Sequence, residues 1–259
     1  MNRIANTSKN LLKNGSAKVL LLVLSGAFLI ALPSAVSAQK SFKKSYPASK
    51  NVRLDLVNRT GTVTVEGWER NEIRISASLE RPYASIEPSS HSGQIRIDVV
   101  KANQGRGEVG DANFTIYVPY GATVDIETRI GNLNVSNVRG VYVRAHITSE
   151  GDVTLTNIVA SKVTAKNVNG NMFFDGIVRP GGTYVFKSVT GDVNVRIPLE
   201  SSFRLLATAP TTRNISLGSF SNTSMRLIGN GRRVVGKVGG GSATLTVENL
   251  RGTISFLRR

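Results

Sequence analysis

A four-residue pattern that returns about every 20 residues constrains this chain more than any other feature of its sequence. Each copy has a glycine, then Asn or Asp, then an apolar residue, and then a residue expected to face outward. The copies are Gly131–Asn134, Gly151–Thr154, Gly170–Phe173 and Gly191–Asn194, and their glycines are separated by 20, 19 and 21 residues. Repeats at a fixed period are typical of folds that stack one structural unit on the next.

Shorter β-type segments lie between these copies, at Val141–Val143, Lys162–Ala165 and Tyr184–Phe186. Each period therefore holds two short strands and two turns. One such coil exposes a row of apolar side chains, and the next coil covers it when the two stack at the strand spacing of ~4.8 Å. We therefore predict an all-β fold, a β-solenoid or β-helix-like stack of short strands. A meander of antiparallel hairpins is the alternative, although hairpin turns have no reason to keep such a period.

The stacked arrangement assigns a direction to each repeated side chain. The predicted inward set is apolar and comprises Leu133, Val135, Val153, Leu155, Val163, Ala165, Val168, Met172, Phe174, Val193 and Val195. Glycine permits the positive φ that each corner needs, and Asn or Asp beside it can bond to the turning backbone. The residues after the glycines, Asn132, Asp152, Asn171 and Asp192, would stack as an outward polar ladder, and they are candidate binding residues.

Period-two alternation, which is typical of strands, runs through most of the chain after Ser41. The strands predicted before the repeats are Val52–Val57, Gly61–Gly67, Ile73–Ala77, Ile95–Val99 and Phe114–Val118. Residues 45–128 are thus assigned as amino-terminal strands, and residues 129–259 as repeats and a carboxy-terminal cap. Helix should be nearly absent.

The first 38 residues predict a cleavable secretory signal. The cations Arg3, Lys9, Lys13 and Lys18 precede the apolar run Val19–Leu32, with no acidic residue before it. This run is shorter than the ~20 residues of a bilayer-spanning helix, and small residues follow it, so cleavage after Ala38 is expected. An uncleaved amino-terminal anchor is the alternative. The domain at residues 39–259 would be exported, whether periplasmic, cell-surface or secreted, with no transmembrane segment after cleavage.

The exported part is basic and has no cysteine. The chain's formal charge of +16 becomes +12 without the four signal cations (33 − 4 = 29 basic against 17 acidic residues). An exported basic surface meets anionic envelope polymers, lipid head groups or extracellular nucleic acid, and charge alone does not separate them. We expect polymers or lipid head groups as partners and no nucleic acid. The alternative interpretation is that the positive charge serves only to keep the protein soluble.

Basic residues are densest in the last 34 residues. This segment holds Arg226, Arg232, Arg233, Lys237, Arg251, Arg258 and Arg259 against one acid, Glu248. Guanidinium groups pair with phosphate bidentately, so Arg232, Arg233, Arg258 and Arg259 are candidate contacts for phosphate-bearing lipid or polymer. The alternative is a charged end cap that discourages edge-to-edge stacking.

The segment Leu54–Trp68 has a strand, an Asn-x-x-Gly turn, a second strand and a Gly-Trp pair in that order. Together with Tyr117–Pro119, the repeats, Ile197-Pro198 and Leu250–Phe256, it resembles the bacterial "putative adhesin" domain family, also catalogued as a domain of unknown function. The resemblance covers residues 45–259. It implies a β-solenoid-like envelope protein, and it supplies no catalytic residues.

The sequence offers little support for catalysis. Gly105–Gly110 matches G-x-G-x-x-G in spelling, but a strand follows it where a dinucleotide site needs a helix. The two histidines, His91 and His146, without any cysteine, make a metal site or a Ser-His-Asp triad improbable. Glu66, Glu69 and Glu72 surround Trp68, which suggests a glycosidase only weakly. No cofactor or metal is expected.

We therefore predict a non-enzymatic, exported adhesin-like or scaffold protein of the bacterial envelope. One alternative is a binder or sensor of anionic envelope lipid or polymer. The other is a carbohydrate-active enzyme on a β-helix, such as a polysaccharide lyase, which fold analogy alone supports.

Overall fold

The computed structural model describes residues 40–259. The chain divides into two units, Met1–Ser37 and Ala38–Arg259, and the described residues all belong to the second. The predicted secretory signal lies outside the described residues and stays a prediction. The described residues of the second unit form one hydrophobic core cluster, as expected of a folded domain.

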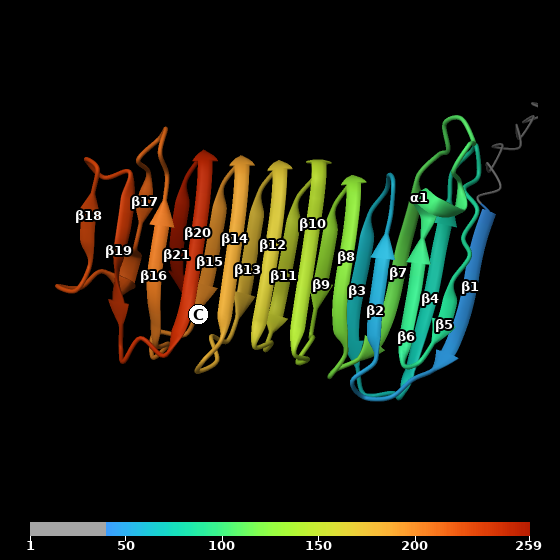
Figure 1. Ribbon diagram of the computed structural model, residues 1–259, viewed down its shortest axis with the longest axis horizontal. Coiled ribbons are helices and arrows are strands. Elements are labelled where there is room, and N and C mark those ends of the chain that lie inside the picture. The colour runs from blue at the N-terminus through green and yellow to red at the C-terminus, as the bar shows by residue number, and fades with distance from the viewer. Residues whose placement is uncertain (1–39) are drawn as a thin grey trace, which may run out of the picture. The chain divides into compact units, whose positions relative to one another are not determined.

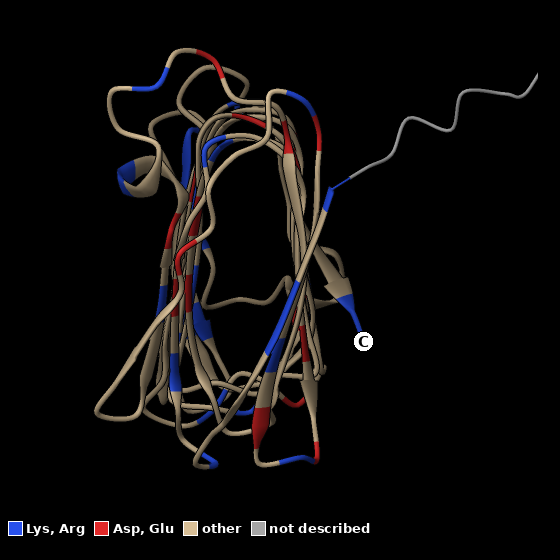
Figure 2. Ribbon diagram, turned by 90° about the vertical axis from the view of Figure 1, so that its right-hand side faces the viewer, with Lys and Arg blue, Asp and Glu red and all other residues tan. Residues whose placement is uncertain are grey.

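Two large β-sheets face each other and enclose this core (Figures 1 and 2). Sheet A contains, in spatial order, β1 (Lys40–Pro47), β4 (Glu72–Leu79), β7 (Ala112–Pro119), β3 (Val63–Trp68), β9 (Leu133–Ser136), β11 (Val153–Ile158), β13 (Met172–Gly176), β15 (Val193–Ile197), β21 (Ile254–Arg258) and β17 (Ile215–Ser216). Sheet B contains β18 (Arg226–Ile228), β19 (Arg233–Val238), β16 (Phe203–Thr208), β20 (Ala243–Arg251), β14 (Thr183–Thr190), β12 (Lys162–Asn169), β10 (Tyr142–Glu150), β8 (Thr123–Ile130), β2 (Arg53–Val57), β6 (Gln94–Asp98) and β5 (Ser89–His91). The helices of the described part are short: α1 (Val99–Ala102) and the 3-10 turn η1 (Gly218–Phe220).

Each sequence repeat forms one coil, with a strand in sheet B followed by a strand in sheet A. The coils β8/β9, β10/β11, β12/β13 and β14/β15 follow one another in space, and neighbouring coils pair in parallel in both sheets. The predicted β-solenoid is therefore confirmed, and the hairpin meander is wrong for the repeats. Parallel pairing also crosses residue 128, because β2 pairs with β8 and β3 with β9.

At both ends the order in space departs from the order in sequence (Figure 1). The coil β2/β3 lies between β6/β7 and β8/β9, and the last coil, β20/β21, is inserted between β14/β15 and β16/β17. Antiparallel strands close the stack: β1, β4 and β5 at one end, and β19 and β18 at the other. Three of the edge strands, β5, β17 and β18, have only two or three residues, which limits edge-to-edge association.

The inward side chains form columns that run along the stack. Leu133, Val153, Met172, Val193 and Ile254 occupy equivalent positions, and each is 0% exposed. Since parallel coils place like residues in contact, each apolar side chain is covered by its counterparts in the neighbouring coils.

The predicted inward set is buried except for Val168, which is 41% exposed, so the prediction for that residue is wrong. Ala165 faces inward and Lys166 outward, so strict alternation places Asn167 inside and Val168 outside. Asn167 suits the inner position because its Nδ2 donates to the carbonyl oxygen of Gly170 at 2.6 Å and so closes the corner.

Glycines stack at the corner that leads from sheet B to sheet A. Gly170 has φ of 133°, and a Cβ there would lie 2.1 Å from the carbonyl oxygen of Gly151. Gly151 in turn has φ of 143°, and a Cβ there would lie 2.2 Å from the carbonyl oxygen of Gly131 in the preceding coil. The corner therefore requires glycine both for its backbone angle and for the close approach of the coils.

Replacement of Gly170 by alanine should lower the free energy of unfolding by more than about 2 kcal/mol, because the new methyl group meets backbone atoms at a forbidden φ. Urea denaturation of the Ala38–Arg259 unit measures this effect. Gly107→Ala is the matched control, since a Cβ there meets nothing within 4 Å. It should change stability by less than about 0.5 kcal/mol, and equal effects of the two substitutions would refute the steric account.

Candidate binding face of sheet B

The predicted polar ladder is present at the glycine corner. The backbone N–H of Asp152 donates to Asn132 Oδ1 at 2.9 Å, and that of Asn171 donates to Asp152 Oδ1 at 2.6 Å. The series continues from Asp192 N–H to Asn171 Oδ1 at 3.0 Å. Asp192 Oδ1 in turn accepts from the backbone N–H of Thr253 at 2.7 Å, so all four side chains are exposed but each has one oxygen that joins its coil to the neighbouring one. Ligand binding by the ladder stays a prediction.

The four candidate arginines are divided between the two sheets. Arg232 and Arg233 lie at the start of β19 in sheet B, whereas Arg258 and Arg259 lie at the end of β21 in sheet A. Arg259 is engaged by the scaffold, because its Nε is 3.3 Å from Asp175 Oδ1 and its guanidinium donates to Asn157 at 3.1 Å.

The amino-terminal half of the outer face of sheet B is a network of paired charges. Arg144 contacts Asp125 at 2.8 Å and Glu127 at 2.6 Å, and Arg53 contacts Asp55 at 2.6 Å and Asp125 at 2.9 Å. Each of these two arginines is thus neutralised by two carboxylates.

This network perturbs the acidity of its members. Burial raises the pKa of Glu127, but hydrogen bonds and charges from Arg144 and His146 together outweigh it, so the pKa lies below its ordinary value. Burial alone would lower the pKa of Arg144, yet its bonds to Asp125 and Glu127 raise it overall. Both groups are therefore held in their charged forms.

The carboxy-terminal half of the same face carries a different pattern, which we call the basic half-face. It comprises the outward cations of β12, β14, β16, β18 and β19, namely Lys162, Lys166, Lys187, Arg204, Arg226, Arg233 and Lys237. Within this part of the described chain, the one outward acid on sheet B is Glu248, on β20, which pairs with Lys187 at 2.8 Å. The half-face therefore has a large excess of positive charge.

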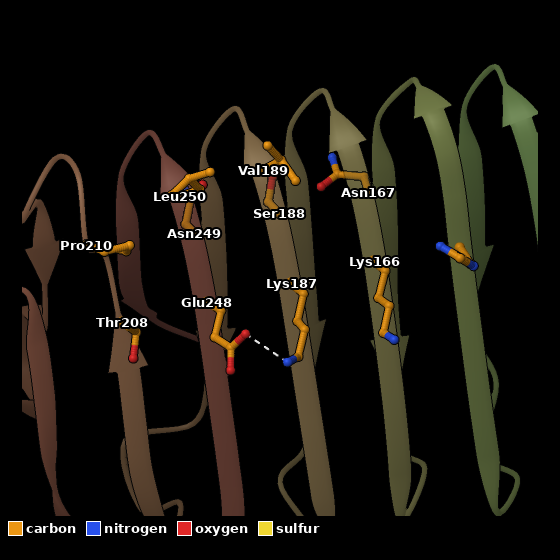
Figure 3. A pocket seen from close by; sticks show the side chains of 11 residues that line it. Lys166, Asn167, Lys187, Ser188, Val189, Thr208, Pro210, Glu248, Asn249 and Leu250 are labelled. Atoms are coloured by element: carbon orange, nitrogen blue, oxygen red, sulfur yellow. Dashed lines mark ion pairs between the residues drawn. The ribbon is translucent and has the colours of Figure 1, made fainter.

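A groove of about 380 Å³ crosses the strands of this half (Figure 3). One side is a row of residues in register on β10, β12, β14, β20 and β16: His146, Lys166, Lys187, Glu248 and Thr208. The other side is apolar and is formed by Val189, Leu250 and Pro210. The volume falls in the range of roughly 300–1,000 Å³ that is usual for small-ligand sites.

The floor of the groove is formed by Asn167, Ser188 and Asn249, which are in register and buried. Because these small polar residues turn inward, the outward rows on either side stand about 6.8 Å apart along the strands. Asn249 Nδ2 donates to the carbonyl oxygen of Gly191 at 2.8 Å, so the floor also holds the glycine corner.

The sequence analysis missed this groove, although a signal for it is present. Three triplets, Lys166–Val168, Lys187–Val189 and Glu248–Leu250, each have a charged residue, a small polar residue and an apolar residue, and each ends two residues before a corner glycine. Parallel stacking aligns the triplets, so that their charged residues form one side of the groove, their small polar residues form its floor, and Val189 and Leu250 contribute to its apolar side.

The other residues considered for chemistry do not converge. His91 lies on β5 and His146 on β10, with three strands between them in sheet B. Among residues 40–259, no group of three or more His, Asp or Glu side chains is placed to hold a metal ion. Over the same residues, no helix has the length and apolar character required to cross a membrane.

Trp68, on β3, makes contacts with β7 and β4, the two strands that follow β3 across sheet A. Its ring stacks on Tyr117 of β7 at a centroid distance of 5.0 Å, and its Nε1 donates to the carbonyl oxygen of Glu72 on β4 at 2.8 Å. The Arg74 guanidinium lies 4.9 Å from the ring centroid. The ring is therefore occupied by contacts within the sheet.

A stack of parallel coils with regular outer faces and antiparallel ends defines a two-sheet β-solenoid. The chain belongs to the Toastrack DUF4097 family, whose model matches residues 35–255. Among curated proteins, none matches the chain significantly in sequence.

Three solved structures are similar to the chain. A "putative cell adhesion protein" from Clostridium sporogenes is 13% identical, with 85% of this chain and 100% of that chain covered and a TM-score of 0.54. A "putative adhesin" from Bacteroides fragilis is 9% identical over 85% and 97% of the chains, with a TM-score of 0.37. A "putative lipid binding protein" from Parabacteroides distasonis has the same identity and coverage and a TM-score of 0.30. The first of these shares the fold.

The substitution Glu127→Gln should destabilise the fold at neutral pH by less than about 1 kcal/mol, because the charge network is partly exposed. The folded pKa of Glu127 is below its ordinary value of 4.5, so its stabilising effect is present above that pH. The effect is lost as the pH falls through the folded pKa. Urea midpoints at several pH values should therefore converge for the two proteins in acid. Glu108→Gln, in an exposed loop, is the control, and a constant difference at all pH values would contradict the linkage.

Proposed function

We propose that this protein is an exported, non-enzymatic adhesin-like or scaffold protein of the bacterial envelope. The observation that carries the proposal is the register of the outer faces, where equivalent outward residues of successive coils form continuous rows. Within a row, neighbouring residues are spaced by ~4.8 Å, so each row presents many equivalent contacts to an extended partner. Such a surface suits attachment at many points better than the conversion of one bound molecule.

Two further features support the proposal. The predicted signal at residues 1–38 would deliver the solenoid beyond the cytoplasm. The Clostridium sporogenes structure, which shares the fold, carries a cell-adhesion description, and we propose a role of that kind here.

The carbohydrate-active enzyme is less well supported. Of the three glutamates near Trp68, Glu72 accepts from Ser45 at 3.3 Å and from Arg74 at 3.4 Å, so its carboxylate is engaged by neighbouring residues. The aromatic ring that would stack on a sugar is itself engaged by Tyr117 and Arg74.

A second candidate function is the binding or sensing of an anionic envelope lipid or polymer. The observation that favours it is the charge asymmetry of sheet B, where Arg53, Arg96 and Arg144 of one half are ion-paired and most cations of the basic half-face are not. This function is a specific form of the adhesin-like role.

Expression of the full chain with a carboxy-terminal tag tests export. We expect the tagged protein in the periplasmic, envelope or medium fraction, with a mature amino terminus at residue 39. An intact amino terminus in the cytoplasm would overturn the exported role.

Purified Ala38–Arg259 should also be retained on isolated envelopes of its own bacterium, as measured by co-sedimentation. Bovine serum albumin serves as the non-binding control. A solenoid that sediments no more than the control does not have the adhesin-like or scaffold role.

A further inference from the structure

We infer that the basic half-face and its groove bind the surface of a bilayer that contains anionic phospholipid. The cations would contact lipid phosphates, and the apolar side of the groove would contact the upper part of the acyl chains. This inference rests on the proposed envelope function and names the partner and the residues of one face.

The charges of the groove favour an anionic partner. Lys166 has no carboxylate within ion-pair distance among the described residues. The neighbouring pair of Lys187 and Glu248 is 44% and 43% exposed, so water already screens it and a phosphate can compete for the lysine. Anionic leaflets attract clustered lysines and arginines in this way.

The apolar residues of the groove decide between a lipid and a polymer. Val189 and Leu250, which line the groove, are 38% and 41% exposed, and each lies two positions beyond a residue of the charged row. Val168, 41% exposed, has the same place on β12 but lies outside the lining. A bilayer presents phosphate at one depth and hydrocarbon at the next, which matches the charged row, with its two lysines, beside an apolar row. A hydrophilic polyanion would leave the apolar row in water.

The carboxy-terminal end of sheet B also carries apolar and cationic side chains next to each other. Strand register places Leu206 beside Val235, and Val235 beside Arg226. The next pair of β18 and β19 on the same face is Ile228, which is 46% exposed, and Arg233. The apolar and cationic side chains therefore continue beyond the groove to the edge strand β18.

Co-sedimentation of Ala38–Arg259 with vesicles tests the inference. We expect binding to vesicles of phosphatidylcholine with phosphatidylglycerol, little binding to phosphatidylcholine alone, and weakening as salt rises from about 50 to 500 mM. Lys166→Glu with Lys187→Glu should weaken binding about tenfold or more. The control, Lys43→Glu with Lys50→Glu, makes the same change of net charge at exposed sites elsewhere and should change binding less than about twofold.

A second pair of variants separates lipid from polymer. Val189→Ser with Leu250→Ser should weaken vesicle binding about fivefold and leave binding to soluble polyphosphate unchanged. Val141→Ser with Ile177→Ser is the matched control, because these residues are 68% and 40% exposed outside the groove. Circular dichroism verifies that each variant is folded.

Three results would overturn the inference: no preference for anionic vesicles, equal loss in the two lysine pairs, or vesicle binding that ignores the Val189 and Leu250 substitutions. Binding to polyphosphate with no binding to vesicles would assign the face to a polymer instead. Retention on native envelopes without vesicle binding would refute the lipid surface and leave the adhesin-like role intact. Absence of binding both to vesicles and to native envelopes would refute the lipid-binding inference and the adhesin-like role together.

Discussion

The close approach of backbone at the glycine corner is the constraint on which the rest of the structure depends. A Cβ at Gly151 or Gly170 would lie within 2.2 Å of a carbonyl oxygen in the coil before it, so no other residue allows the coils to stack so closely. This contact, together with the parallel ladders, fixes the register between coils. In the polar ladder, side-chain oxygens of Asn132, Asp152 and Asn171 then each accept a hydrogen bond from a backbone N–H of the following coil.

Because the register between coils is fixed, residues at equivalent positions in successive coils form continuous rows on the surface. In a single strand, a lysine two residues from a valine forms no extended surface. When the strands are aligned, such pairs form a charged row and an apolar row. The same register neutralises the other half of sheet B, where Arg144 on β10 reaches both Asp125 and Glu127 on β8. The two halves therefore differ in their capacity to bind an external anion because their charges are arranged differently.

Buried polar groups are also part of the scaffold. Asn167 and Asn249 occupy positions where alternation alone would favour an apolar residue, and their amides donate to carbonyl oxygens of the glycine corner. Asp175 is buried but contacts Arg196 at 3.0 Å and Arg259 at 3.3 Å, which holds the end of the chain against the coils. The basic carboxy terminus thus serves stability at one residue that the sequence suggested for binding.

The sequence by itself determined the repeat, the near absence of helix, the inward columns and the ladder, because period, alternation and glycine spacing are local properties that each coil expresses. It misplaced Val168, although alternation from Ala165 already turns Asn167 inward and Val168 outward. The reason for a polar residue at the inner position, the bond from Asn167 to Gly170, is visible only once the coil is closed. Only the tertiary structure decided that β20/β21 enters beside β14/β15, that the candidate arginines belong to different sheets, and that three triplets form a groove. These features depend on which strands are neighbours in the sheets. Pairing between strands that are distant in the sequence is set by the packing of the whole stack, and no local residue pattern specifies it.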